Sequence, residues 1–132
     1  VNTPEKLRAM WQTLGESAEK GICVVWRPHG YGPLRKNFDG LVKMFSSVVR
    51  PKDRLLLLPV YDAGGTADRS VDAATFFEAL AAKGVNAEIF RDYDEVLSWI
   101  AENQSLFGIF ATCGARDPML PELSRQISEI LI

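Results

Sequence analysis

Short apolar runs alternate with amphipathic segments along the chain. The runs 22–26 and 55–58 contain no alternating polar residue. We therefore expect strands whose two faces are both covered, as in a parallel sheet. The runs 87–90 and 106–112 predict two further strands.

Apolar residues between these runs recur at the three- and four-residue spacing of a helix. The first helix is expected to start at Thr3 as N-cap with Pro4 in its first turn. Ser70 is expected to cap the third helix, and Asp92 with Glu95 resembles a capping box for the fourth. The predicted buried faces are Leu7, Met10, Trp11 and Leu14; Phe38, Leu41, Val42 and Phe45; Phe76, Phe77 and Leu80; Val96, Leu97 and Ile100; and Leu120, Leu123, Ile127 and Ile130.

The predicted order is one helix followed by four strand–helix units. Strands separated by single helices run parallel, because only a crossover connection returns the chain to the same edge. We therefore expect an α/β fold with a Rossmann-like, doubly wound, mainly parallel open sheet and helices on both faces. Because the chain begins with a helix, the first strand is expected to lie before Val1. Residues 1–132 are then a single domain from a longer chain.

Composition narrows the class of protein. The 132 residues are 47% hydrophobic and 24% charged, as in an ordinary soluble globular protein. The net charge of −2 provides no basic stripe for nucleic acid, and no apolar run approaches the roughly 20 residues that span a membrane. Cys23 and Cys113 both fall in strand-like runs and are interpreted as core residues in a reducing compartment. A cytoplasmic protein is expected.

Polar loops are expected after three of the strands. The stretch 26–35 is predicted to be a loop and holds the only histidine of the chain, and the stretches 61–69 and 113–118 follow two other strands. The carboxyl ends of parallel strands meet at one edge, where α/β proteins bind ligands. The predicted binding residues are therefore His29, Tyr31, Arg35, Tyr61, Asp62, Arg116 and Asp117.

Each loop also has a purely structural interpretation. His29 can be a loop histidine that hydrogen-bonds to the backbone, and the glycine pair at 64–65 can be a simple turn. Arg116 and Asp117 can form a local ion pair and helix cap. The sequence alone leaves these alternatives open.

Several common catalytic and cofactor motifs do not occur in the sequence. There is no G-x-x-x-x-G-K-[ST] phosphate loop, no G-x-S-x-G elbow and no Cys/His spacing typical of zinc. Gly30 and Gly32 form only part of a dinucleotide-binding fingerprint, because Arg35 stands where the third glycine would be. No catalytic residue and no metal ligand is therefore assigned.

Three stretches, taken in order, resemble the C-terminal domain of the Mur ligases, especially the UDP-N-acetylmuramate–L-alanine ligase branch. The family pattern P-H-R-Y-S-R-T follows a strand, as residues 28–31 do here. Residues 60–64 match V-Y-x-A-G-E, and residues 114–115 match the start of G-A-G-D. Residues 2–6 resemble the segment after the family's D-D-Y-A-H motif.

The resemblance implies a role in bacterial cell-wall (peptidoglycan) precursor synthesis. These ligases use ATP and magnesium to activate a carboxylate as an acyl phosphate and join it to the amine of an amino acid. The phosphate loop and metal site lie in a central domain, and the UDP-sugar site lies in an N-terminal domain. The C-terminal domain is a Rossmann-like lid. On this interpretation the chain is catalytically inert alone and works with the other two domains.

The resemblance also implies residue roles. His29 and Arg35 would contact the amino-acid carboxylate or the phosphate side, and Tyr31 and Tyr61 would shape the pocket. Arg116 with Asp117 would order the last loop. Gly30 and Pro33 replace two family arginines, and Gly65 replaces a glutamate. Arg35 and Arg116 then supply the charge from other positions, or the acceptor amino acid differs.

Two other functions remain open at this stage. The chain can be a free-standing Rossmann-like module that binds a nucleotide or another phospho-ligand without chemistry. It can also be a structural domain whose loops dock against neighbours.

Overall fold

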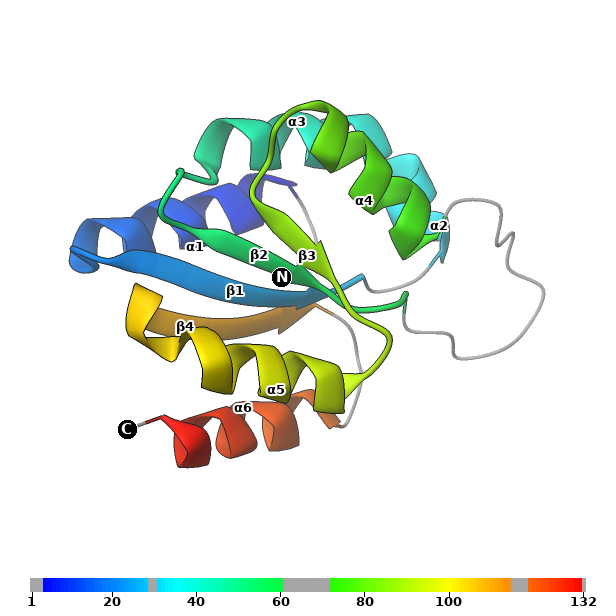
Figure 1. Cartoon of the computed structure of the whole chain (residues 1–132). Coiled ribbons are helices and arrows are strands. Elements are labelled where there is room, and N and C mark those ends of the chain that lie inside the picture. The colour runs from blue at the N-terminus through cyan, green and yellow to red at the C-terminus, as the bar shows by residue number, and fades with distance from the viewer. Residues whose placement is uncertain (1–3, 29–30, 61–71, 115–118, 132) are drawn as a thin grey trace.

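Four parallel strands form one sheet in the computed structural model, which describes residues 4–28, 31–60, 72–114 and 119–131 (Figure 1). The strands are β1 (Gly21–Arg27), β2 (Arg54–Leu57), β3 (Ala87–Ile89) and β4 (Phe107–Gly114). Their order across the sheet is β3-β2-β1-β4, and every described pairing is parallel. The predicted α/β fold with a Rossmann-like parallel sheet is confirmed.

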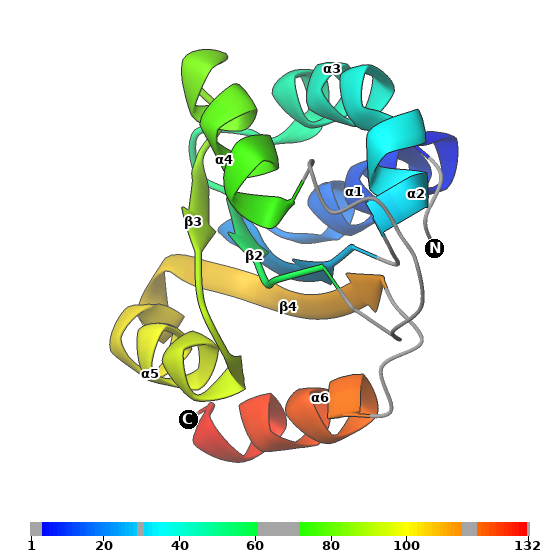
Figure 2. The ribbon, with the colours of Figure 1, turned by 90° about the vertical axis from the view of Figure 1, so that its right-hand side faces the viewer.

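Helices cover both faces of this sheet (Figures 1 and 2). The helices are α1 (Pro4–Ser17), α2 (Tyr31–Lys36), α3 (Phe38–Val48), α4 (Ala73–Ala82), α5 (Tyr93–Asn103) and α6 (Met119–Ile130). One layer holds α1, α2, α3 and α4, and the other holds α5 and α6. A short 3-10 helix, Gln104–Leu106, precedes β4.

Alternate residues of the central strands enter opposite layers of the core. Ile22, Val24 and Trp26 pack against the α1–α4 layer, whereas Cys23 and Val25 pack against α5 and α6. Residues 55–58 alternate in the same way, and all four are fully buried. The absence of polar alternation in these runs thus correctly predicted strands that are covered on both faces.

The stretch 26–35 is not one loop, which corrects the sequence-based prediction. Trp26 and Arg27 complete β1, and α2 begins at Tyr31. Leu34 of α2 is only 2% exposed and joins the core, so burial of its side chain favours the helix. Pro33 lies in the first turn, where the backbone N–H that proline lacks would have no helical partner.

Asp72, not Ser70, is the N-cap of α4, which is a second correction. The Asp72 carboxylate accepts hydrogen bonds from Thr75 N at 2.9 Å and Thr75 Oγ1 at 3.0 Å. The predicted cap at Asp92 is confirmed, because its carboxylate accepts from Glu95 N at 2.9 Å. Thr3, the predicted cap of α1, lies outside the described residues.

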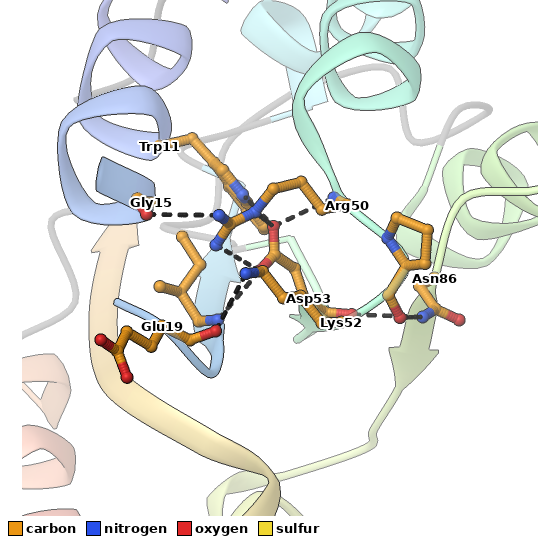
Figure 3. Close-up of polar contacts among 9 residues, drawn as sticks. Trp11, Gly15, Glu19, Arg50, Lys52, Asp53 and Asn86 are labelled. Atoms are coloured by element: carbon orange, nitrogen blue, oxygen red, sulfur yellow. Dashed lines mark hydrogen bonds and ion pairs between the residues drawn. The ribbon is translucent and has the colours of Figure 1, made fainter. Parts of the chain in front are cut away.

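A buried carboxylate joins three elements at the amino ends of β1 and β2 (Figure 3). Asp53 is 1% exposed and accepts from Trp11 Nε1 of α1 and from Ile22 N of β1, both at 2.9 Å. Arg50 donates from Nε and Nη2 to the two carboxylate oxygens, each at 2.9 Å. Burial acts to raise the pKa of Asp53, but the hydrogen bonds from Arg50, Trp11 and Ile22 outweigh it and hold that pKa below its ordinary value.

Candidate functional site

The carboxyl ends of the strands form the edge at which a ligand site is expected. Figure 2 faces this edge, which lies on the right of Figure 1. The connection from β1 leads toward β2, whereas β4 lies on the other side of β1. The carboxyl ends of β1 and β4 therefore form the topological switch point, where open α/β sheets bind ligands.

Two of the predicted binding residues can be placed at this edge. Tyr31 is the first residue of α2 and packs partly buried against the core, whereas Arg35 is exposed on the same helix. They are four residues apart, so the helix projects both from one side. The other predicted residues lie outside the described part of the chain: His29, Tyr61, Asp62, Arg116 and Asp117.

A pocket of about 400 Å³ opens between the ends of β2 and β3 and the beginning of α4. Val60, Ile89 and Phe90 give it an apolar wall, and Tyr31 also lines it. Small-molecule sites typically have volumes of roughly 300–1,000 Å³ and are mostly apolar with a few placed polar groups. This pocket therefore has the size and the mainly apolar lining of a small-molecule site. Tyr31, one of the binding residues predicted from the sequence, is part of that lining.

Two charged residues stand among the described lining of the pocket. Hydrogen bonds from the backbone N–H and the hydroxyl of Thr75 hold the pKa of Asp72 below its ordinary value, so its carboxylate is ionised at neutral pH. Arg91 donates from Nε and Nη2 to Glu95 Oε2 at 2.9 and 2.7 Å. The pocket is thus mainly apolar, and the carboxylate of Asp72 and the guanidinium of Arg91 belong to its lining.

Arg27 is a further charged group at the switch point. Its Nη1 donates to the Tyr93 hydroxyl at 3.1 Å, and its guanidinium carbon lies 5.5 Å from the centre of the Tyr93 ring. Arg27 ends β1 and Tyr93 begins α5, so the contact joins two elements that meet at this edge. The contact with Tyr93 holds the guanidinium of Arg27 in place at the end of β1, so this positive charge is carried by a strand residue.

The end of β4 lies tightly against the backbone of Arg27. Gly114 is the register partner of Arg27 and has φ +119°. A Cβ atom at Gly114 would lie 2.0 Å from the carbonyl oxygen of Arg27. The glycine is therefore required both by its backbone conformation and by this close approach.

Sequence reasoning missed Arg27, Tyr93 and the residues that follow β3. The sequence-based prediction placed binding residues after β1, β2 and β4. It placed none after β3, although β3 runs parallel to β2 and ends at the same edge. Phe90 and Arg91 could have been included on that ground. Strand alternation could have placed Arg27 on the side of Cys23 and Val25, but no local pattern links it to Tyr93.

Two chemical features of the described residues bear on what the edge can do. Burial raises the pKa of both Cys23 and Cys113 to about 12, so neither thiol is a nucleophile at neutral pH. In the described ranges, no three side chains of His, Cys, Asp or Glu are grouped so that they could hold a metal ion.

A broader hollow of about 670 Å³ lies between α1 and α3, near the amino ends of the strands. Trp11 and Arg50 line it, and both donate hydrogen bonds to Asp53. Arg50 also donates from Nη1 to the carbonyl of Gly15 at 3.2 Å. Because parallel α/β sheets bind ligands at the carboxyl ends of their strands and this hollow lies near the amino ends, we take the carboxyl-edge pocket as the candidate site.

Comparison with known proteins finds UDP-N-acetylmuramate–L-alanine ligases. The chain is 25% identical over 114 residues to the ligase of Caldicellulosiruptor saccharolyticus, which covers 86% of the chain and 24% of that ligase. It is 27% identical over 123 residues to the ligase of Ruthia magnifica, covering 91% of the chain and 25% of the relative. It is 33% identical over 82 residues to the ligase of Xylella fastidiosa, covering 61% and 16%.

These similarities confirm the resemblance to Mur ligases and support a Mur-ligase-like domain. The chain spans about a quarter or less of the length of these relatives. No protein-family model matches the chain. Within the described residues, no helix is both long enough and apolar enough to cross a membrane.

Proposed function

We propose that this chain is the C-terminal lid and substrate-binding domain of an ATP-dependent amide-forming ligase. The ligase would add an amino acid to UDP-N-acetylmuramate during peptidoglycan precursor synthesis in the bacterial cytoplasm. The observation that carries the proposal is the similarity to UDP-N-acetylmuramate–L-alanine ligases over as much as 91% of the chain. Because the chain spans only about a quarter of those relatives, its proposed partners are the N-terminal and central domains of the same ligase.

ATP and magnesium are proposed to bind mainly on the other domains. The sequence has no phosphate loop, and the described residues contain no group of three side chains suited to a metal ion. These residues therefore do not fit a triphosphate–magnesium site of their own. In the complete ligase, ATP would supply the activation of the carboxylate, and this domain would take part by binding and orientation.

The residues of the carboxyl edge are proposed to hold the incoming amino acid. Arg35, with His29, would bind an anionic carboxylate or phosphate oxygen through charge-assisted hydrogen bonds. Tyr31 lines the apolar pocket, which supports a role in shaping it. The proposed site also includes Tyr61, Asp62, Arg116 and Asp117. Its closure over the other domains would exclude water from the activated carboxylate.

The test is steady-state kinetics of the complete ligase that carries Arg35→Ala. The KM for the acceptor amino acid is expected to rise roughly 10- to 100-fold, because a hydrogen bond to a charged group is worth about 1.5–3 kcal/mol. ADP release would be followed at saturating ATP and UDP-N-acetylmuramate while each amino acid is varied in turn. The same survey identifies the acceptor.

Lys36→Ala is the matched control, because Lys36 is the neighbouring exposed cation on α2. It is expected to leave the KM unchanged. A wild-type KM in the Arg35→Ala ligase would refute the role of Arg35. If the wild-type protein formed no amide product with any amino acid, the ligase function itself would be refuted.

The second candidate is a Rossmann-like module that binds a nucleotide or another phospho-ligand without catalysis. The apolar pocket at the carboxyl ends of β2 and β3 favours it, because open α/β sheets bind ligands outside the carboxyl ends of their strands. This candidate predicts that ATP or UDP binds the 132-residue chain alone. Titration calorimetry would detect that binding, and the ligase proposal predicts none of comparable strength.

A further inference from the structure

The pocket at the carboxyl ends of β2 and β3 is much larger than a methyl group. It lies beside the start of α4 (Figure 2) and has a volume of about 400 Å³. Pockets of roughly 300–1,000 Å³ enclose most of a drug-sized ligand. The relatives are named as ligases of L-alanine, whose side chain is a single methyl group. That methyl group would fill only a small part of this pocket.

The wall of the pocket is apolar and partly open to solvent. Val60 is 4% exposed, whereas Ile89 is 38% exposed although it lines the same pocket. Ile89 is the register partner of Leu57, which packs in the α1–α4 layer, so both side chains lie on that face of the sheet. An apolar group placed against Ile89 would remove this surface from water. Such burial is the main favourable contribution to the binding of an apolar ligand.

The carboxylate in the lining already has hydrogen-bond donors of its own. Asp72 is the N-cap of α4 and accepts hydrogen bonds from the backbone N–H and the hydroxyl of Thr75, at 2.9 and 3.0 Å. The positive end of the dipole of this ten-residue helix also opposes its charge. Asp72 is therefore a poor counter-charge for a cationic side chain.

The guanidinium in the lining is compensated as well. Arg91 donates from Nε and Nη2 to Glu95 Oε2 at 2.9 and 2.7 Å, and its backbone N–H donates to Glu95 Oε1 at 2.6 Å. An anionic side chain bound to Arg91 would displace these hydrogen bonds or bring a second carboxylate close to Glu95. Because both charges in the lining are already paired, the pocket discriminates by apolar contact rather than by charge.

The pocket lies next to the residue that is proposed to bind the carboxylate of the amino acid. Tyr31 lines the pocket, and Arg35 follows it by four residues on α2. Residues at that spacing lie on one side of a helix, with Cβ atoms about 5–6 Å apart. The carboxylate and the side chain of an amino acid branch from one carbon. A single amino acid is therefore short enough to contact both residues.

We propose that this pocket holds the side chain of the acceptor amino acid and selects a large neutral apolar one, such as that of leucine. The inference rests on the proposed function, which supplies the acceptor amino acid. It departs from the L-alanine named for the relatives, to which the chain is only 25% to 33% identical. On this view the carboxylate binds at Arg35, and the pocket distinguishes one side chain from another.

A comparison of acceptors with the complete ligase tests this selection. ADP release gives kcat/KM for L-leucine, L-alanine, L-glutamate and L-lysine at saturating ATP and UDP-N-acetylmuramate. The value for L-leucine is expected to exceed each of the others at least tenfold, because one methylene in an apolar pocket is worth roughly tenfold or more. If L-alanine or a charged amino acid were used as well as L-leucine, the inference would be overturned and the ligase function would stand.

Two leucine substitutions on α4 form a matched pair. Ala74 is exposed in the first turn and lines the pocket, so Ala74→Leu narrows it. The preference for L-leucine over L-alanine is expected to fall at least fivefold, with little change in kcat/KM for L-alanine. Ala81→Leu makes the same change at an exposed position in the last turn and is expected to keep the preference. The same preference in the two variants would contradict the proposal.

A second matched pair removes apolar surface instead of adding it. Ile89→Ser takes away part of the pocket wall and is expected to lower the preference for L-leucine severalfold. Leu106 is 53% exposed before β4, so Leu106→Ser makes a comparable change elsewhere and is expected to have no effect on the preference. Equal effects of the two serine substitutions would count against the pocket.

Titration calorimetry separates this inference from the ligase function. The complete protein, with UDP-N-acetylmuramate and a non-hydrolysable ATP analogue, is titrated with L-leucine and with L-alanine. Tighter binding of L-leucine that Ala74→Leu weakens, in a protein that forms no amide, would refute the ligase function and leave the pocket's selectivity in place. A protein that neither binds L-leucine nor forms an amide would overturn both.

Discussion

At the scale of single residues, Asp53 accepts hydrogen bonds from a helix, a strand and the turn before β2. Its replacement therefore tests how much these bonds at the amino ends of the strands stabilise the fold. Asp53→Asn removes the ion pair with Arg50 and introduces an amide group that donates where Trp11 or Ile22 also donates. We expect a loss of about 3 kcal/mol in the free energy of unfolding, as for other broken buried pairs. Guanidinium denaturation at pH 7 measures it.

The control for Asp53 is an arginine that is paired only at the surface. Arg125 contacts Glu122 and Glu129 on the exposed side of α6. Arg125→Gln is expected to leave the denaturation midpoint nearly unchanged, because exposed ion pairs are screened by water. If the Asp53→Asn and Arg125→Gln proteins unfolded at the same guanidinium concentration, the structural role given to Asp53 would be wrong.

Gly114 and Gly32 form a second contrast between residues. Gly114→Ala is expected to destabilise the protein by about 2 kcal/mol or more, because the new Cβ would meet the Arg27 carbonyl oxygen and φ is positive. Gly32→Ala places a Cβ in open space within α2 and is expected to stabilise by up to about 1 kcal/mol. Thermal unfolding of the two variants gives the comparison, and equal melting temperatures would contradict it.

At the scale of elements, α2 depends on one buried side chain. Leu34 is the only residue of this six-residue helix that is fully buried. Leu34→Ala is expected to cost about 2–4 kcal/mol and to speed amide exchange of residues 31–36, because the cavity removes the contact that holds the helix to the core. Pro33→Ala is the control, since Pro33 is exposed. Similar denaturation midpoints for the two variants would exclude this explanation.

The regular elements were largely predictable because their patterns are local. Apolar runs without alternation predicted β1 and β2, and a carboxylate three residues before Glu95 predicted the start of α5. The helix α2 was not predictable in this way, because Pro33 and two glycines are typical of a loop. Its helical state comes from the burial of Leu34 against residues that are distant in sequence.

At the scale of the whole molecule, stability is expected to fall in acid. The pKa of Asp53 is lower in the folded state than its unfolded value of about 3.9. The stabilisation from its ionised form is therefore complete above that unfolded value and is lost as the pH falls toward the folded pKa. Urea denaturation midpoints measured from pH 7 to pH 2 should decrease below about pH 4, and Asp53→Asn should flatten this decrease. An unchanged slope in the variant would assign the acid sensitivity to other carboxyl groups.

The candidate site was predictable only in outline. The expected parallel strands bring their carboxyl ends to one edge, and the structure places Tyr31 and Arg35 there. The binding role of this edge stays a prediction. The strand order that puts β4 beside β1 follows from packing across the whole chain, so no local motif revealed the contact between Arg27 and Tyr93. The pocket that follows β3 depends on the same long-range arrangement.

The hydrogen-bond cluster around Asp53 and the pocket around Val60 have no residue in common. One lies at the amino ends of the strands and the other at the carboxyl ends. Substitutions at the pocket can therefore accumulate during evolution without weakening the cluster that holds α1, β1 and β2 together. A lineage of such domains can therefore change the molecule that it recognises while its fold persists.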